Sequence, residues 1–198
     1  MADGGRVIAG SARGVRLLAV GPEIRALSDR VKESLFGALE AERVVGPGKA
    51  FLDLFAGTGA AGIEALSRGS LRAVLVESDR AAARVIEQNL ARAHLAGGTV
   101  GQMDVLRFLG QDPAGQGGPF DAVLVDPPYA SDLVGPVLTA LGEAERDWLS
   151  ARAVVVAKHF WRAAPPPKIG RLERYRERRF GETMLTFYRL PQAEAVDQ

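Results

Sequence analysis

The stretch Phe51-Leu-Asp-Leu-Phe-Ala-Gly-Thr-Gly59 limits the possible folds of this chain more than any other. A short apolar run stops at an acid, Asp53, and then turns through glycines into residues that favour a helix. This order is typical of a buried parallel strand that leads through a tight turn into a helix, and open α/β sheets bind their ligands at such strand ends. The stretch therefore predicts a ligand site at this turn.

Strands and helices alternate after residue 50, which predicts a parallel sheet with helical crossovers. The predicted strands are 50–54, 71–76, 99–103, 120–125 and 153–158, and the predicted helices are 60–68, 79–94, 105–109 and 133–141. Residues 168–179 and 183–190 then read as a terminal antiparallel pair of strands. The apolar fraction of 47% is ordinary for a globular enzyme. We expect one domain, 1–190, followed by a flexible tail, 191–198.

The N-terminal region predicts two further elements. Residues 6–18 form two short β runs around a glycine-bearing turn, so we expect a hairpin that contributes little to the core. Ser28 followed by Asp29 has the form of a helix start, and the apolar spacing extends that helix to about Arg43.

Composition narrows the cellular setting. Net charge is +1, cysteine is absent, and no apolar run approaches the length of a membrane span. The N-terminus has no apolar signal segment, so we expect a cytoplasmic protein. His94 and His159 lack partner patterns, and we expect no metal site.

The glycines allow two kinds of cofactor. Gly57, Gly59 and Gly62 match the dinucleotide fingerprint, and Glu77 lies at the end of the next strand, where an acid binds ribose hydroxyls. Asp53 precedes the glycines, however, and would repel a diphosphate while attracting a cationic amine and sulfonium. Asp104 ends the third strand and could accept from an adenine amine.

Three acids on successive strand ends favour S-adenosylmethionine. The candidate cofactor residues are Asp53, Phe55, Gly57, Thr58, Gly59, Glu77, Ser78, Met103 and Asp104. The plain alternative is that the glycines form only a tight turn and that Asp53 only caps a helix.

A second constellation, Asp126-Pro-Pro-Tyr129, follows the strand at 120–125. Asp126 and the Pro127 carbonyl could each accept a hydrogen bond from one exocyclic amine, while Pro128 stiffens the turn and Tyr129 stacks on the base. Two acceptors free the amine lone pair for attack on a methyl group, so catalysis depends on positioning and electrostatics. The alternative is a proline turn that caps a strand, with Tyr129 as packing.

Basic residues gather in two segments. The first supplies candidate RNA-binding residues, which are Arg6, Arg13, Arg16, Arg25, Arg30 and Lys32. For the second, residues 162–179, phosphate binding and a solvated surface remain equally open. Phe160 and Trp161 could border the base pocket, although the sequence favours core packing.

Four segments together resemble the bacterial RsmD family. They are residues 24–33, residues 51–69, Asp126–Tyr129 and residues 180–188, and the likeness extends from Arg6 to Tyr188. One departure is Ala26-Leu27, which stands where the family has a proline-containing turn.

The resemblance implies a Rossmann-like class I methyltransferase sheet of seven strands, the last antiparallel, flanked by helices and extended by an N-terminal hairpin. It implies that Asp53, Gly57, Gly59, Glu77 and Asp104 contact S-adenosylmethionine and that residues 126–129 form the target-base pocket. The implied reaction is methylation of a guanine N2 in small-subunit ribosomal RNA, by a monomer, on naked RNA or on an assembling subunit. Another amino methyltransferase, acting on DNA adenine or protein glutamine, and a non-catalytic RNA-binding module remain as alternatives.

Overall fold

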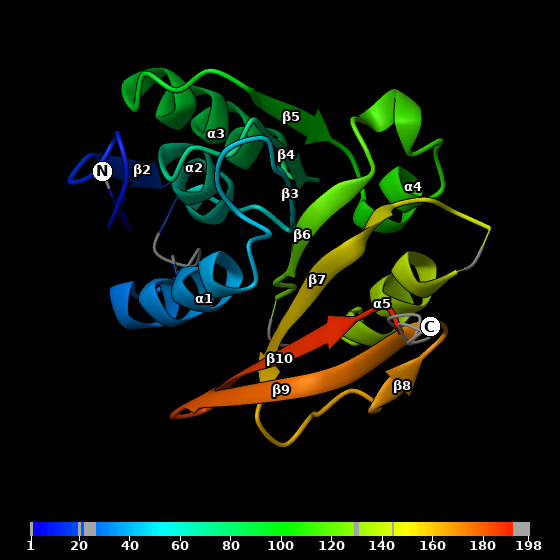
Figure 1. Cartoon of the computed structure of the whole chain (residues 1–198). Coiled ribbons are helices and arrows are strands. Elements are labelled where there is room, and N and C mark those ends of the chain that lie inside the picture. Colours follow the sequence, from blue (N-terminus) through cyan, green and yellow to red (C-terminus); the bar gives the residue numbers. More distant parts are fainter. Residues whose placement is uncertain (1, 20, 22–26, 129–130, 144, 192–198) are drawn as a thin grey trace, which may run out of the picture.

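The structure, a computed structural model, describes residues 2–19, 21, 27–128, 131–143 and 145–191. Figure 1 shows a central sheet with α1, α2 and α3 on one face and α4 and α5 on the other. The helices are α1 (Asp29–Ala41), α2 (Ala60–Ser67), α3 (Arg80–Arg92), α4 (Val105–Leu109) and α5 (Val134–Gly142), with a 3-10 turn at Ala114–Gln116. The strands are β1 (Ala2–Arg6), β2 (Arg16–Ala19), β3 (Ala50–Leu54), β4 (Arg72–Glu77), β5 (Gly98–Gln102), β6 (Phe120–Val125), β7 (Leu149–Phe160), β8 (Lys168–Ile169), β9 (Leu172–Phe180) and β10 (Thr183–Arg189).

The central sheet has the strand order β5-β4-β3-β6-β7-β10-β9-β8. The five strands from β5 to β7 are parallel, and β10 is antiparallel to both β7 and β9. The chain progresses outward from β3 in one direction and then from β6 in the other, so the point between these neighbours is the topological switch where such sheets bind ligands. The predicted α/β architecture with an antiparallel last strand is therefore confirmed.

The strand count differs from the prediction. The described sheet has eight strands instead of seven, because the run expected at 168–179 is divided into β8 and β9. Gly170 breaks the run with a φ of +54°, and a Cβ there would lie 2.7 Å from the Gly142 carbonyl oxygen. That same oxygen accepts a hydrogen bond from Arg171 N at 3.1 Å. Contact with the end of α5 thus sets the break.

Alternating side chains of the strands divide the core into two parts. Phe51 of β3 and Leu124 of β6 face α1, α2 and α3, and Phe51 stacks on Phe36 of α1 at 5.8 Å between ring centroids. Leu52 and Val123 face the opposite side, where α4, α5 and the buried Trp148 pack. Because both faces of the parallel strands are covered, these strands read as continuous apolar runs.

Helix α1 begins as expected. Ser28 Oγ accepts from Val31 N at 3.4 Å, which satisfies one of the open donors at the helix start. The apolar residues at helical spacing in this segment, Val31, Leu35, Phe36 and Leu39, all lie in the core.

The N-terminal hairpin differs from its prediction in both bounds and packing. Its strands are β1 and β2, so residues 7–15, which include the expected first strand, form the connection. The expectation that the hairpin adds little to the core was wrong, because Val7 and Leu17 are buried.

Buried polar side chains of α2 and α3 hold the hairpin. Glu64 accepts from Ile8 N and Ala9 N at 2.8 and 3.0 Å, and Ser67 Oγ accepts from Ala12 N at 2.9 Å. Asn89 accepts from Leu18 N at 2.8 Å and donates to the carbonyls of Leu18 and Thr58 at 3.0 and 2.9 Å. Asn89 thus connects the hairpin, α3 and the glycine turn.

We predict that Asn89→Ala lowers the free energy of unfolding by about 2 to 3 kcal/mol, because buried backbone groups lose their partners. Urea unfolding measures the change. Gln88→Ala, at an exposed neighbouring position on the same helix, is the control and should stay within about 0.5 kcal/mol of the wild type. Equal stability of the two variants would contradict the role given to Asn89.

Candidate active site

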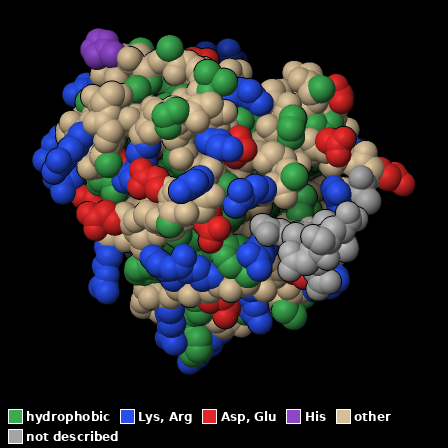
Figure 2. Space-filling model, in the orientation of Figure 1, with side chains coloured by type: hydrophobic (Ala, Val, Ile, Leu, Met, Phe, Trp, Pro, Cys, Tyr) green, Lys and Arg blue, Asp and Glu red, His purple; other side chains and the backbone are tan. Residues whose placement is uncertain are grey.

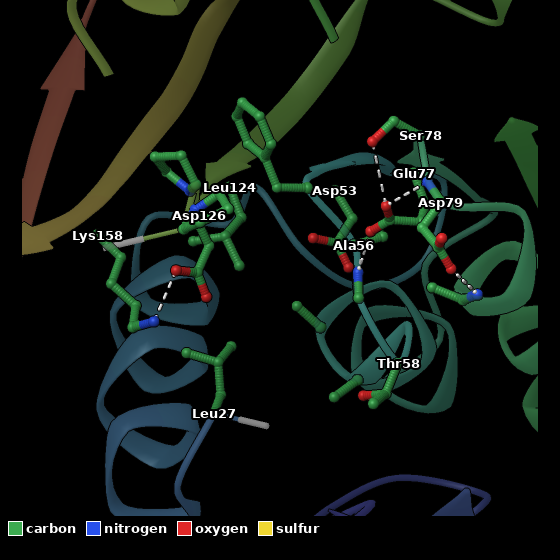
Figure 3. A pocket seen from close by; sticks show the side chains of 17 residues that line it. Leu27, Asp53, Ala56, Thr58, Glu77, Ser78, Asp79, Leu124, Asp126 and Lys158 are labelled. Carbon is green, nitrogen blue, oxygen red and sulfur yellow. Dashed lines mark hydrogen bonds and ion pairs between the residues drawn. The ribbon is translucent and has the colours of Figure 1, made fainter. Parts of the chain in front are cut away.

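A cavity of about 360 Å³ lies at the carboxyl ends of β3, β4 and β6. Figure 3 shows Asp126 and Lys158 on one side, Glu77, Ser78 and Asp79 on the other, and Asp53 between them. Leu27, Ala56, Ala60, Ala61, Ala82 and Leu124 supply apolar lining. The cavity therefore combines apolar surface with four carboxylates, from Asp53, Glu77, Asp79 and Asp126.

The turn after β3 uses a backbone conformation that side chains rarely adopt. Phe55, Gly57 and Gly59 have φ values of 66°, 56° and 77°. At Gly59, which directly precedes α2, a Cβ would come within 2.9 Å of Ile86 Cγ2. Glycine is thus required there both by the backbone and by the packing of α2 on α3.

Asp53 is buried at the end of β3, with 2% of its surface exposed. Its Oδ2 accepts a hydrogen bond from Gly62 N in the first turn of α2 at 2.8 Å. Burial raises the pKa of Asp53 to about 8, and the charges of Asp126 and Glu77 add to the rise while the Gly62 hydrogen bond opposes it. Asp53 thus accepts from a donor in the first turn of α2 and also lines the cavity, and its expected contact with a cofactor stays a prediction.

Glu77, the last residue of β4, accepts a hydrogen bond from the glycine turn that follows β3. Its Oε2 accepts from Gly57 N at 2.9 Å, and its Oε1 accepts from Asp79 N at 2.9 Å. Asp79 in turn caps α3 by accepting from Ala82 N at 2.8 Å. The end of β4 is thus fixed relative to the turn after β3.

These hydrogen bonds bear on the choice of ligand. Diphosphates bind to open backbone donors at a glycine turn and a helix N-terminus. Here Gly57 N and Gly62 N already donate to carboxylates, Gly59 N donates to the Ala56 carbonyl, and Ile63 N donates to the Gly59 carbonyl. The turn consequently disfavours a dinucleotide and suits a ligand with positive charge.

An ion pair joins the ends of β6 and β7. Lys158 Nζ lies 2.6 Å from Asp126 Oδ1, and the two side chains are only 12% and 16% exposed. Burial raises the pKa of Asp126, whereas the Lys158 ammonium lowers it. The sequence did not single out Lys158, although its place at the end of the apolar run 153–157 was a usable signal.

The ion pair lies between two hollows. A second hollow of about 180 Å³ shares Asp126, Pro127, Pro128 and Lys158 with the cavity and adds Phe160. The Pro128 carbonyl accepts from both N and Oγ of Ser131, at 3.0 and 2.8 Å. Tyr129, the expected stacking residue, lies outside the described residues.

The predicted cofactor residues fall into two groups. Asp53, Phe55, Gly57, Thr58, Glu77 and Ser78 line the cavity, and Gly59 lies in the same turn, directly before α2, without lining it. Met103 and Asp104 lie beyond its lining at the end of β5, where Asp104 caps α4 by accepting from Arg107 N at 3.0 Å. Their expected contact with an adenine stays a prediction.

The predicted RNA-binding residues are also divided. Arg6, Arg13, Arg16 and Arg30 are exposed, and Arg6 Nε pairs with Asp29 Oδ2 at 2.8 Å. Lys32 is fully buried; its ammonium donates to the Arg6 carbonyl and lies 3.3 Å from Asp29 Oδ1. Lys32 therefore holds the hairpin to α1 and does not lie on the basic surface. Arg25 lies outside the described residues.

Among the residues described, His, Cys, Asp and Glu side chains form no group of three that could hold a metal ion. His159 is buried, and its Nε2 lies 2.8 Å from Thr186 Oγ1. Within the described part of the chain, no helix is long and apolar enough to cross a membrane.

The fold and the acid-lined cavity define a Rossmann-like methyltransferase of class I. A family model described as "Conserved hypothetical protein 95", which represents the RsmD family, matches residues 5–189, and the chain belongs to this family.

Known proteins agree with this assignment. The chain is 34% identical to the Ribosomal RNA small subunit methyltransferase D of Escherichia coli K12, over 96% of this chain and 90% of that protein. Two solved structures are similar. One is an E. coli protein described as a methyltransferase candidate, with a TM-score of 0.81 and 31% identity over 95% of this chain and 98% of that chain. The other is a hypothetical protein of Thermus thermophilus, with a TM-score of 0.78 and 33% identity over 93% of this chain and 99% of that chain.

We predict that the ligand-free protein becomes less stable as pH rises, because folding raises the pKa of Asp53. Because the pKa is raised from 3.8 to about 8 on folding, the folded protein holds a proton that the unfolded chain releases. Stability present below about pH 4 is therefore lost as pH approaches 8. The difference in unfolding free energy between wild type and Asp53→Asn should change by on the order of 1 kcal/mol per pH unit in this window. Urea unfolding at several pH values tests this, and parallel profiles would contradict it.

Proposed function

We propose that this protein transfers a methyl group from S-adenosylmethionine to the exocyclic N2 amine of a guanine in small-subunit ribosomal RNA. The observation that carries the proposal is the Asp126–Lys158 ion pair, which stands between the acid-lined cavity and the second hollow. One hollow suits a cationic methyl donor, and the adjoining one suits a planar acceptor.

The cavity fits S-adenosylmethionine through its charge. The ligand has a positive amine and a sulfonium. The carboxylates of Glu77 and Asp126 lie on two sides of the space, and Asp53 lies between them (Figure 3). Asp53 is protonated below about pH 8 in the ligand-free protein and would ionise toward a bound cation. Glu77 has the strand-end position from which an acid accepts from ribose hydroxyls. When bound, S-adenosylmethionine would supply an electrophilic methyl group.

Asp126 has two roles toward the acceptor amine. An exocyclic amine is a weak nucleophile because its lone pair is delocalised into the ring. A hydrogen bond to Asp126 and a second to the Pro127 carbonyl draw the amine out of conjugation and direct its lone pair. As the nitrogen–carbon bond forms, the sulfur–methyl bond breaks, and its electron pair stays on the neutral thioether that leaves. The nitrogen thereby becomes more acidic, and Asp126, whose pKa burial has raised, accepts its proton.

Lys158 holds the Asp126 carboxylate in position and in its ionised form. Its ammonium holds Oδ1 in place and favours the ionised form, and a carboxylate has further lone pairs for the substrate amine. Lys158 is thus a positioning residue that acts through Asp126.

Small-subunit ribosomal RNA is proposed as the substrate because the relatives of this chain are named for that reaction. A guanine has one exocyclic amine, N2, and reaching it in a helix requires the base to be flipped out. The exposed Arg6, Arg13, Arg16 and Arg30 would contribute phosphate contacts. We propose further that the protein acts as a monomer, on free RNA or on a partly assembled subunit.

We predict that Asp126→Ala lowers the rate of methyl transfer at least about a hundred-fold while S-adenosylmethionine still binds. The assay is transfer of labelled methyl to ribosomal RNA and to small-subunit particles from a strain that lacks this methylation, followed by nucleoside analysis for N2-methylguanosine. The double variant Asp126→Ala/Lys158→Met is the matched control, because it leaves no unpaired buried ammonium, and it should be equally inactive. Calorimetry measures cofactor binding.

Different failures of this assay have different meanings. A methylated adenine or a methylated protein glutamine would assign the chain to another amino methyltransferase. RNA binding without transfer, unchanged by loss of Asp126, would make it a binding module. Binding of NAD in place of S-adenosylmethionine would overturn the cofactor assignment.

We predict that Lys158→Met shifts the acidic limb of the kcat–pH profile to higher pH. Without the ammonium, the pKa of Asp126 rises further because burial is then less opposed. The ionised, active form therefore needs a higher pH, and kcat at neutral pH should fall about ten-fold. Lys158→Arg retains the charge and should restore most of the profile. Coincident profiles for wild type and Lys158→Met would rule out the positioning role.

A further inference from the structure

A partly exposed tryptophan lies at the edge of the sheet where the active site opens. β7 is parallel to β6, so its last residue, Phe160, ends at the same edge as Asp126. Trp161 follows, and its N donates to the Glu182 carbonyl at 3.0 Å, which fixes it beside the turn between β9 and β10. The sequence favoured core packing for Phe160 and Trp161, yet neither side chain is buried.

Two guanidinium groups stack on this tryptophan. The Cζ atoms of Arg179 and Arg162 lie 3.9 and 4.7 Å from the centroid of its ring. Arg179 Nε also donates to the Gly181 carbonyl at 2.8 Å, which orients its guanidinium without neutralising it. The other tryptophan of the chain differs: Trp148 is fully buried, packs on Phe108 at 5.1 Å and donates from Nε1 to the Leu109 carbonyl.

The surface continues to α1 through a second aromatic residue. Arg30 lies 5.9 Å from the centroid of Phe180, the last residue of β9. We name Arg30, Phe160, Trp161, Arg162, Arg179 and Phe180 together the aromatic–arginine rim. Figure 2 shows Lys and Arg side chains gathered at the lower end of the visible face, where Figure 1 places the β9–β10 turn.

Two basic residues away from this edge, Lys168 and Arg174, pair with acids instead of stacking on a ring. At the opposite end of β9, Lys168 pairs with Glu173 at 2.7 Å and Arg174 pairs with Glu177 at 2.9 Å. Within this basic segment, Lys168 and Arg174 are thus compensated by acids, whereas Arg162 and Arg179 at the rim both lie over the ring of Trp161.

The rim adjoins the pocket proposed for the target base. Phe160 belongs to both, because it lines the second hollow with Asp126 and Pro127 and lies 6.2 Å from Trp161 between ring centroids. A strand whose base enters the hollow would therefore place its neighbouring nucleotides on the rim. Unpaired bases stack on aromatic and guanidinium planes, and phosphates pair with arginine.

Resting on the proposed function, we propose that the aromatic–arginine rim binds the RNA nucleotides next to the flipped guanine. Trp161 provides the stacking surface for a neighbouring base, and Arg162 and Arg179 bind the adjacent phosphates. The rim thereby supports the strand at the edge where β7 and β9 end, on either side of the first residue of β10.

The test combines RNA binding with kinetics. Trp161→Ala should weaken binding of a single-stranded segment of small-subunit ribosomal RNA about ten-fold and raise the KM for RNA similarly, because a stacked base is lost. Trp161→Phe keeps an aromatic ring and should restore most of both. Arg179→Ala should reduce the slope of log binding constant against log salt by about 1. Lys168→Ala, which removes one exposed charge from the same basic segment, is the control and should bind the RNA about as tightly as the wild type.

Tryptophan fluorescence gives a readout independent of methyl transfer. RNA should quench the wild-type emission and leave Trp161→Phe, which keeps only the buried Trp148, nearly unchanged. Wild-type RNA binding in Trp161→Ala, with methylation intact, would overturn the rim proposal but not the proposed function. Variants that bind free RNA normally but fail only on subunit particles would show a protein-docking surface and overturn it too. Rim-dependent RNA binding without any methyl transfer would instead refute the proposed function alone.

Discussion

The rest of the site depends on two hydrogen bonds from backbone amides to carboxylates, Gly62 N to Asp53 and Gly57 N to Glu77. They join β3, β4 and α2 into one rigid corner, and they use the donors through which glycine turns of this shape otherwise hold phosphates. The same bonds therefore shape the turn and make it favour a positively charged ligand over a phosphate. This arrangement buries the carboxyl group of Asp53, and the loss of solvation raises its pKa.

The register of the sheet produces the second essential contact. Val125 of β6 pairs with Ala157 of β7, so Asp126, the first residue after β6, lies beside Lys158, which is still within β7. An aspartate in this position would otherwise repel Asp53 across the cavity. The lysine offsets that repulsion, and it lines both the cavity and the second hollow.

The sequence predicted the features that local patterns determine. The bounds of β3, α4 and β6 are those expected, and the acids at strand ends, Asp53, Glu77 and Asp126, do meet at one cavity. The misses depend on contacts between distant segments. Glu64 looks like an ordinary helix-surface acid, yet the hairpin buries it. Lys32 looks like a surface cation, yet it caps a hairpin carbonyl. Lys158 gains meaning only from its neighbour in the sheet. Asp104 follows the strand-end pattern and also caps the short helix α4, so its contact with an adenine stays a prediction.

The net charge of +1 is an average over two surfaces of opposite sign: acids line the cavity, and arginines lie at the outer rim. Acids concentrate in the cavity, where they favour a small cation and exclude phosphate, whereas arginines at the rim face outward, where a polyanion can reach them. The two partners of the proposed reaction carry opposite charges, so this arrangement directs each to its own surface. Asp126 and Lys158 lie where the two regions meet. Because the acid is paired with a base, the pair has no net charge and repels neither the cationic ligand nor the polyanion. The sorting of the two substrates and the activation of the amine thus depend on the same ion pair.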